Sequence, residues 1–233
     1  MKEVRKVTTI PIKGTIVSND YKEVYDWLGY DNVSPKDVSD ILKGVNGQDV
    51  TLEINSPGGY ISAGSEIYTV LREYREYTGN ITAKIVGQAC SAASWIALAA
   101  DKVIMSPTAQ MMIHRASTDV SGNIDDLSSA ANAVNEMDQA YVDLYSKKTG
   151  KTPDEIYQMM AKTTWMNAKT AVENGFADEI MFENEPAVVN ADGDLVVKPE
   201  MISKIKNLLH EEKNEEKPVK SQEKENLALL LWE

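Results

Sequence analysis

The sequence predicts an α/β protein with a largely parallel sheet. A strand-like segment, a turn of small residues and a helix-like segment follow one another twice, over residues 50–77 and 81–100. Such repeated units favour parallel strands, because each helix returns the chain to the end of the sheet where the previous strand began. The 233 residues are 42% hydrophobic and 26% charged, which is sufficient for one main core.

The first part of the chain contains two distinct local signals. An alternating apolar and polar segment that includes Pro11 and Gly14 predicts an edge strand with a break, because proline lacks a backbone donor. Ser34, Pro35 and Asp37 combine an N-cap, a proline at the first helical position and an acid at the third. The predicted elements are a strand over 7–17, a helix from 34 to between 44 and 47, a strand over 50–54, a tight turn over 55–59 and a helix over 62–77.

The second part of the chain contains signals for further strands and helices. Residues 125–149 predict a long amphipathic helix, and Thr152 with Glu155 forms a capping box for another. The apolar side of the long helix should be Leu127, Ala130, Val134, Met137, Tyr141 and Leu144. The other predicted elements are a strand over 81–86, a run of small residues over 87–93, an apolar stretch over 94–100, strands over 103–105 and 111–113, and a helix over 167–174 that stops at Gly175.

The composition changes near residue 185, which predicts a folded domain over 1–185 and a charged, partly helical or disordered tail over 186–233. The last 23 residues, 211–233, hold 7 Glu and 4 Lys. An amphipathic helix over 199–211 should precede them. Because the chain ends in an apolar Leu-Ala-Leu-Leu-Leu-Trp run, the tail is either a solvated extension or a docking or cleavable segment.

Charge and cysteine content exclude several classes of function. The chain has 24 Lys and Arg against 36 Asp and Glu, so its net charge of −12 repels nucleic acids and anionic membranes. No apolar run approaches the ~20 residues that span a bilayer, and the N-terminus lacks a secretory signal. A single cysteine, Cys90, fits a reducing compartment. We expect a soluble protein of the bacterial or phage-infected cytoplasm, with no nucleic-acid or membrane partner.

Few residues can carry chemistry. Of two histidines, His210 lies beside the charged tail and His114 follows an apolar strand, where a neutral imidazole could accept a proton. Ser91 lies at a strand-to-helix junction, and Gly58 with Gly59 allows a close backbone approach. Each feature alone also has a structural explanation. Glycine motifs for dinucleotides or phosphates and clusters of metal ligands are absent, so we expect no cofactor and no metal.

Taken together, three ordered motifs carry a family resemblance. Asn-Ser-Pro-Gly-Gly at 55–59, Gly-Gln-Ala-Cys-Ser at 87–91 and Met-Ile-His at 112–114 resemble the proteolytic subunit of the Clp protease, a serine peptidase family. The resemblance extends from about residue 10 to residue 178. It implies a ClpP/crotonase-like fold of repeated strand-turn-helix units, in which residues 125–149 form a protruding handle helix that joins homo-oligomeric rings, as a heptamer or a double ring.

The resemblance also implies roles for individual residues. Ser91 corresponds to the nucleophile, His114 to the general base, and the backbone amides of Gly59 and Ala92 to the oxyanion hole. An extended peptide substrate should pair with the backbone near Gly58, Gly59, Tyr60, Ile61 and Arg115. Ser94 lies out of the family register, and Cys90 should be a packing residue.

Thr163 is a departure from the family pattern. Counting back from Gly175, the family's catalytic aspartate falls on Thr163, which can accept a hydrogen bond but cannot supply a negative charge. Three outcomes stay open: a slower enzyme that uses a Ser-His pair helped by Thr163, recruitment of another acid, or a relative without catalysis.

The segments 26–37 and 91–94 resemble the phage-encoded head maturation branch of this family. That branch implies a serine endopeptidase that processes capsid or scaffold proteins, in the cytoplasm or inside the prohead. The first strand begins by about Val7, which leaves no room for a long axial leader, so we expect no dedicated ATPase partner. The alternatives are an ATPase-dependent housekeeping protease subunit, a weak or inactive assembly scaffold of the same fold, and a crotonase-like acyl-CoA enzyme.

Overall fold

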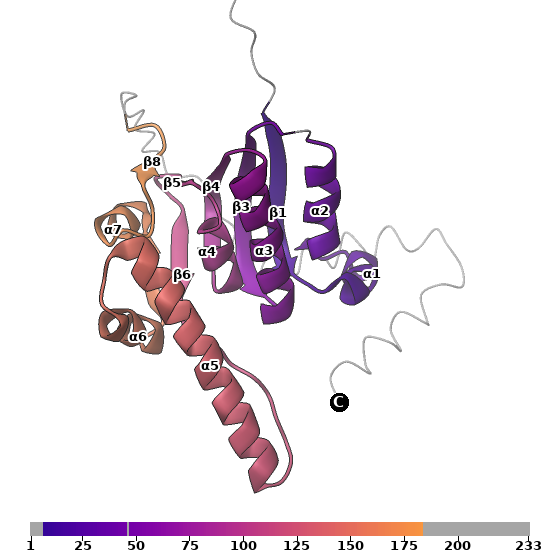
Figure 1. Cartoon of the computed structure of the whole chain (residues 1–233), viewed down its shortest axis with the longest axis vertical. Helices are drawn as coiled ribbons and strands as arrows, with labels where there is room; N and C mark the ends of the chain where they lie inside the picture. Colours follow the sequence, from indigo (N-terminus) through magenta and orange to yellow (C-terminus); the bar gives the residue numbers. More distant parts are fainter. Residues whose placement is uncertain (1–6, 46, 184–233) are drawn as a thin grey trace, which may run out of the picture. The chain divides into compact units, whose positions relative to one another are not determined.

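A computed structural model describes residues 7–45 and 47–183 (Figure 1). The chain divides into two units, Met1–Glu185 and Pro186–Glu233, and all of the described residues belong to the first. The helix predicted over 199–211 and the charged tail lie outside the described residues.

The fold is built on a mainly parallel eight-stranded sheet. Its main path runs in the order β2-β1-β3-β4-β5-β8, and β6 pairs with β4 and with β7. Every pairing is parallel except that of β6 with β7. The strands are β1 (Thr8–Ile16), β2 (Asn32–Val33), β3 (Val50–Gly59), β4 (Ile81–Cys90), β5 (Lys102–Met105), β6 (Gln110–Ile113), β7 (Thr164–Asn167) and β8 (Glu179–Ile180). The predicted α/β class with a largely parallel sheet is therefore confirmed.

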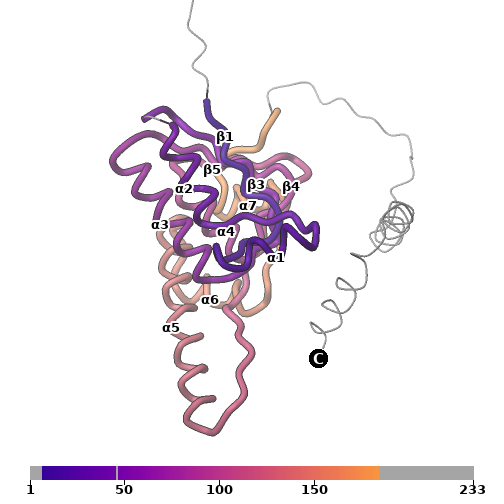
Figure 2. Tube along the Cα trace, turned by 90° about the vertical axis from the view of Figure 1, so that its right-hand side faces the viewer, coloured from indigo at the N-terminus to yellow at the C-terminus, as the bar shows by residue number. Residues whose placement is uncertain are grey.

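Seven helices connect these strands within the described residues: α1 (Asn19–Leu28), α2 (Pro35–Lys43), α3 (Ile61–Tyr77), α4 (Ala92–Ala97), α5 (Ile124–Thr149), α6 (Pro153–Ala161) and α7 (Ala168–Glu173). Helix α3 packs against both α2 and α4, as Figure 1 shows. The N-terminal half of α5 and the segment that leads into it project together beyond the rest of the described residues, which is clearest in Figure 2. This projection matches the protruding helix expected over 125–149.

Local signals account for the helix starts. Ser34 and Asp37 form a reciprocal capping box at α2, and Thr152 and Glu155 form another at α6. Asn167 caps α7, which ends before Gly175 as predicted. Each cap satisfies backbone donors that have no partner inside the helix, so these boundaries depend on a few adjacent residues.

The core lies between the sheet and its helices, and β1, β3 and β4 supply its centre. These strands alternate buried and more exposed residues, and their inward side chains include Ile10, Ile12, Leu52, Ile54 and Ile85, all completely buried. Burial of each such side chain contributes about 1.5–3 kcal/mol. The strands that lead toward the motifs at 55–59 and 87–91 are therefore held by the most buried part of the described residues.

The prediction of a broken edge strand is largely confirmed. The pairing of β1 with β3 shifts between Lys13 and Thr15, and Gly14 lies between them with φ 71°. A Cβ on Gly14 would lie 1.9 Å from the backbone oxygen of Asp31, so only glycine fits. Strand β2 pairs only with Thr15 and Ile16, which leaves the remainder of β1 at the edge.

Two strands are longer than the sequence indicates, and the tight turn predicted over 55–59 is wrong. Residues 55–59 continue β3, and Asn55, Gly58 and Gly59 pair with Lys13, Thr15 and Ile16 of β1. Strand β4 likewise extends to Cys90. The neighbouring strands supply hydrogen-bond partners that outweigh the turn preference of Pro and Gly.

The buried side of α5 agrees with the prediction only in part. Tyr141 and Leu144 pack against the core as predicted. The buried residues of α5 are Asp138, Val142 and Tyr145, whereas Leu127 and Met137 are exposed. The first half of α5 extends beyond the sheet, so its apolar residues have no core to enter among the described residues. The elements α1, β2, β7 and β8 were not predicted. The strands β2, β7 and β8 are too short to show a period in the sequence.

Candidate active site

Ser91 lies between the end of β4 and the start of α4, in a strained backbone conformation. Its φ is 52° and its ψ is −125°, a region in which a non-glycine residue costs about 1–3 kcal/mol. The Ser91 amide donates to the Met112 carbonyl at 2.9 Å, which fixes the turn to β6. A serine on a strained strand-to-helix turn is typical of hydrolase nucleophiles, because the turn exposes the hydroxyl.

His114 immediately follows β6 and contacts Ser91. The pairing of Cys90 with Met112 places the ends of β4 and β6 side by side. As a result, the His114 Nε2 atom lies 2.8 Å from the Ser91 Oγ atom. For Ser91 to donate this hydrogen bond, the neutral imidazole must carry its proton on Nδ1, the tautomer that a general base requires.

The two glycines at the end of β3 approach the same turn. Gly58 has φ 96°, and a Cβ on it would lie 2.8 Å from the Ser91 Cβ and 3.1 Å from the Ala92 nitrogen. Gly59 has φ 156° and lies against Ile16, where a Cβ would come within 2.1 Å of the Ile16 oxygen. The absence of a side chain at Gly58 therefore lets the β3 backbone reach Ser91 and Ala92, and its absence at Gly59 lets β3 lie directly against β1.

A cavity of about 970 Å³ opens beside Ser91 and His114. Gly59, Tyr60, Ile61 and Arg115 also line it, so these predicted substrate-binding residues share one cleft. Apolar side chains from α4 and α5 form another part of its wall, including Trp95, Val134, Met137 and Tyr141.

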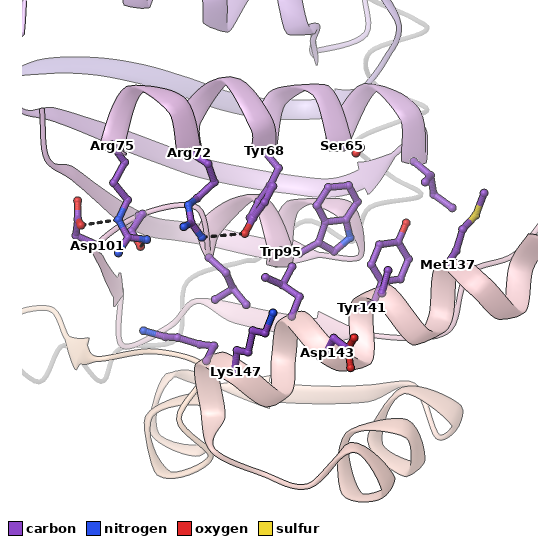
Figure 3. Close-up of a pocket in the computed structure, with 16 residues that line it drawn as sticks. Ser65, Tyr68, Arg72, Arg75, Trp95, Asp101, Met137, Tyr141, Asp143 and Lys147 are labelled. Carbon is purple, nitrogen blue, oxygen red and sulfur yellow. Dashed lines mark hydrogen bonds and ion pairs between the residues drawn. The ribbon is translucent and has the colours of Figure 1, made fainter. Parts of the chain in front are cut away.

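Trp95 and Tyr141 also line an adjoining cavity of about 830 Å³, shown in Figure 3. Their rings stack with centroids 5.4 Å apart and planes 18° apart, which joins α4 to α5. Burial raises the pKa of Tyr141 to about 12, and the nearby charge of Asp138 adds to this effect, so its hydroxyl stays protonated at neutral pH. This aromatic pair forms a neutral wall between the two cavities.

Thr163 lies close to His114 along the sheet but makes no hydrogen bond with it among the described residues. Strands β6 and β7 are antiparallel with Ile113 opposite Thr164, so the next pair in this register is His114 with Thr163. Thr163 has φ 52°, its side chain is exposed, and its amide donates to the Met160 carbonyl. The residue predicted to stand at the family's aspartate position is therefore neutral and exposed.

Two residues of α5, Asp138 and Tyr145, contact the segments that carry Ser91 and His114. The sequence analysis did not predict a role for either residue. Asp138 is completely buried and accepts hydrogen bonds from the Arg115 Nε atom at 2.6 Å and the Ala116 amide at 2.8 Å. Tyr145 is also buried, and its hydroxyl lies 2.6 Å from the Ser94 Oγ atom. The available signal was their spacing of seven residues, which places them on one face of a helix.

Cys90 is buried beside Ser91, in agreement with the packing role expected for it. Burial raises the pKa of its thiol to about 11. Its Sγ atom lies 3.6 Å from the Gln88 side-chain oxygen. Since the thiolate is the reactive form, this thiol is a poor nucleophile at neutral pH.

Residues 7–45 and 47–183 contain no group of three or more His, Cys, Asp or Glu side chains arranged to hold a metal ion. In the same ranges, no helix combines the length and the apolar character needed to span a membrane.

Comparison with known proteins identifies the family. The sequence pattern of the Clp protease family matches residues 41–184, which is more than half of the chain. Among solved structures, an Asn-to-Asp mutant of ClpP1 from Listeria monocytogenes superposes with a TM-score of 0.60 and 23% sequence identity. The match covers 74% of this chain and 90% of that one, which supports the ClpP-like fold. The chain belongs to the Clp protease family.

Proposed function

We propose that this protein is a serine endopeptidase in which Ser91 is the nucleophile and His114 the general base. The observation that carries the proposal is the 2.8 Å contact between the Ser91 Oγ and His114 Nε2 atoms. Its support is the strained turn that presents Ser91 to a cleft of about 970 Å³. A nucleophile within hydrogen-bond reach of a base at the edge of a cavity is the arrangement that acyl transfer requires.

The reaction proceeds through an acyl-enzyme. As the Ser91 oxygen bonds to the carbonyl carbon of the scissile peptide, its proton passes to Nε2 of His114. The imidazolium then protonates the leaving amine, and the C–N bond breaks. Water attacks the ester with His114 again accepting a proton, and the return of that proton to Ser91 releases the second product.

The developing oxyanion is bound by the backbone amides of Gly59 and Ala92. Gly58, the neighbour of Gly59, lies against the Ala92 nitrogen, which brings these two segments together. A donor of this kind contributes about 100- to 1000-fold to the rate, because it stabilises charge that appears only in the transition state. The substrate adds as an extended strand near Gly58 to Ile61 and Arg115, mainly through backbone hydrogen bonds.

The enzyme is slower than family members that have a complete triad. In the reaction, the imidazolium forms without a carboxylate beside it, because Thr163 occupies the corresponding position. Loss of that carboxylate costs about 10⁴-fold in a serine protease of known mechanism. Slow turnover suits an enzyme that makes a few cuts in an assembled substrate rather than one that degrades many chains.

The substrates we propose are capsid or scaffold proteins during phage head maturation. The support is the resemblance of segments 26–37 and 91–94 to the phage-encoded branch. The protein then acts in the infected cytoplasm or the prohead as a homo-oligomeric ring or double ring, with α5 between rings. Light scattering tests this assembly, and a monomer at micromolar concentration contradicts it.

The second candidate is an assembly scaffold with little or no activity, which the neutral and exposed Thr163 favours. A housekeeping subunit that depends on an ATPase is a further alternative. Capture of an unfolding ATPase from host lysate by the purified protein would favour that subunit over a phage maturation protease.

The test is reaction with a fluorophosphonate, which modifies activated serines, followed by intact-mass and peptide mapping. We expect a single adduct on Ser91 that is absent in Ser91→Ala and does not form in His114→Ala within the time that labels the wild type. Absence of an adduct on the assembled wild-type protein would reject the protease and favour the scaffold.

A further inference from the structure

Helix α5 makes two buried polar contacts with the segments that carry Ser91 and His114. Asp138 and Tyr145, which make them, are seven residues apart on one helical face, and both are almost completely inaccessible to solvent. Two of the three buried residues of α5 therefore carry polar groups, and because buried polar groups need partners, their placement beside the same site requires an explanation.

The first contact passes through Ser94 to Ser91. The Ser94 hydroxyl donates to the Ser91 carbonyl at 2.6 Å and lies 2.6 Å from the Tyr145 hydroxyl. A serine hydroxyl has a single proton, so Tyr145 must be the donor to Ser94. Burial raises the pKa of the Tyr145 phenol, which keeps it protonated as a donor. This chain of hydrogen bonds orients the carbonyl of the strained residue Ser91.

The second contact fixes the segment after His114. The buried carboxylate of Asp138 accepts the Arg115 Nε proton with one oxygen and the Ala116 amide proton with the other. The Arg115 guanidinium also lies over the ring of Tyr157, 5.1 Å from its centroid. Because a buried carboxylate needs all of its partners, the backbone that follows His114 has little freedom to move.

We propose that Asp138 and Tyr145 are positioning residues that keep Ser91 and His114 within reach of each other. Tyr145 acts on the Ser91 side through Ser94, and Asp138 acts on the His114 side through Arg115 and Ala116. The proposal rests on the proposed serine-peptidase function. Since a displacement of about 1 Å between reacting groups can cost about 100-fold in rate, both residues should matter although neither contacts the Ser91 Oγ atom.

The chain offers matched controls for both substitutions. Tyr145→Phe has its counterpart in Tyr74→Phe, because the buried Tyr74 hydroxyl donates to the Gln48 carbonyl on another side of the core. Asp138→Asn has its counterpart in Asp101→Asn, which has the same kinds of partner but is exposed where Asp138 is buried. Asp101 also accepts from an arginine Nε atom, that of Arg75, and from a backbone amide, that of Ile81. Neither control residue lines the cleft of Ser91.

The experiment measures the rate of Ser91 modification by a fluorophosphonate, in the full chain and well below each variant's melting temperature. We expect the maximal rate to fall about tenfold or more in Tyr145→Phe and in Asp138→Asn, with the half-saturating concentration unchanged. Tyr74→Phe and Asp101→Asn should lower the melting temperature but keep the rate within about twofold of wild type. A residue with a purely structural role would not produce this difference.

A double substitution tests the route from Tyr145 to Ser91. If Tyr145 acts through Ser94, then Tyr145→Phe should cause no further loss of rate in a Ser94→Ala background. Ser94→Ala removes only a hydroxyl, so it can replace Tyr145→Phe as the variant that breaks this chain of hydrogen bonds if Tyr145→Phe folds poorly. Rates equal to those of the controls, or fully additive losses, would overturn the positioning roles. Failure of the wild-type protein to react would instead reject the peptidase itself.

Discussion

Gly58 lies so close to Ser91 that a Cβ on the glycine would be 2.8 Å from the Cβ of the serine. The same added atom would be 2.7 Å from the Cys90 oxygen, so backbone as well as side chain would have to move. The end of β3 and the turn after β4 are therefore in direct contact, and the geometry of Ser91 depends on a residue 33 positions earlier in the sequence.

This contact predicts that Gly58→Ala inactivates the protein. The methyl group displaces Ser91, and we expect fluorophosphonate reaction to fall at least about 100-fold. Gly29→Ala is the matched control, because Gly29 has a similar φ of 76° but no atom within 4 Å of an added Cβ. That control should lose about 1–2 kcal/mol of stability and keep its reactivity. Equal reactivity of the two variants would contradict the close contact.

The proposed base predicts an acid-sensitive reaction. A protonated imidazole cannot accept the Ser91 proton, so reactivity should be lower in acidic than in mildly alkaline buffer. His114→Ala should lower the rate about 100-fold or more and remove this pH dependence. Both effects are measured as the rate of fluorophosphonate reaction after the protein has equilibrated at each pH. Returning a sample to pH 8 should restore the full rate, which shows that acid did not unfold the protein irreversibly. A flat wild-type profile would be incompatible with His114 as base.

The position of Thr163 predicts a gain of activity. In Thr163→Asp, a carboxylate enters the position just before β7, at the end of the strand pair where His114 follows β6, and we expect the rate of Ser91 modification to rise about tenfold or more. Thr163→Asn is the matched control, because Asn and Asp both tolerate the positive φ of this residue better than threonine does. Both variants should be more stable, but only the aspartate should react faster. An equal rate in Thr163→Asp and Thr163→Asn would mean that a carboxylate at this position does not stabilise the His114 imidazolium.

The buried thiol predicts resistance to alkylation. The pKa of Cys90 is raised to about 11 by burial, so the thiolate is a minor species below that pH and is inaccessible as well. Iodoacetamide near pH 8 should leave the folded protein unmodified and active but add one group after denaturation, as measured by intact mass. Cys90→Ala should keep the wild-type rate of Ser91 modification. Inactivation by alkylation of the native protein would identify Cys90 as a reactive group.

The sequence by itself determined the features that depend on neighbouring residues. The capping boxes at Ser34 and Thr152 locate two helix starts, since their hydrogen bonds close within three residues. Repeated strand and helix segments gave the class of fold. The three motifs that end at Gly59, Ser91 and His114 carried the family resemblance, although the contact between Ser91 and His114 is a property of the folded chain.

Only the tertiary structure decided the features that depend on distant partners. The β1 backbone converts residues 55–59 from a predicted turn into strand, because it supplies hydrogen bonds that no local pattern reveals. The sheet also leaves the first half of α5 without a core among the described residues, so Leu127 is exposed, whereas Asp138 and Tyr145 in the second half are buried. A buried acid and a buried phenol contradict the rule that polar residues face water, and only the groups opposite them, Arg115, Ala116 and Ser94, explain their burial.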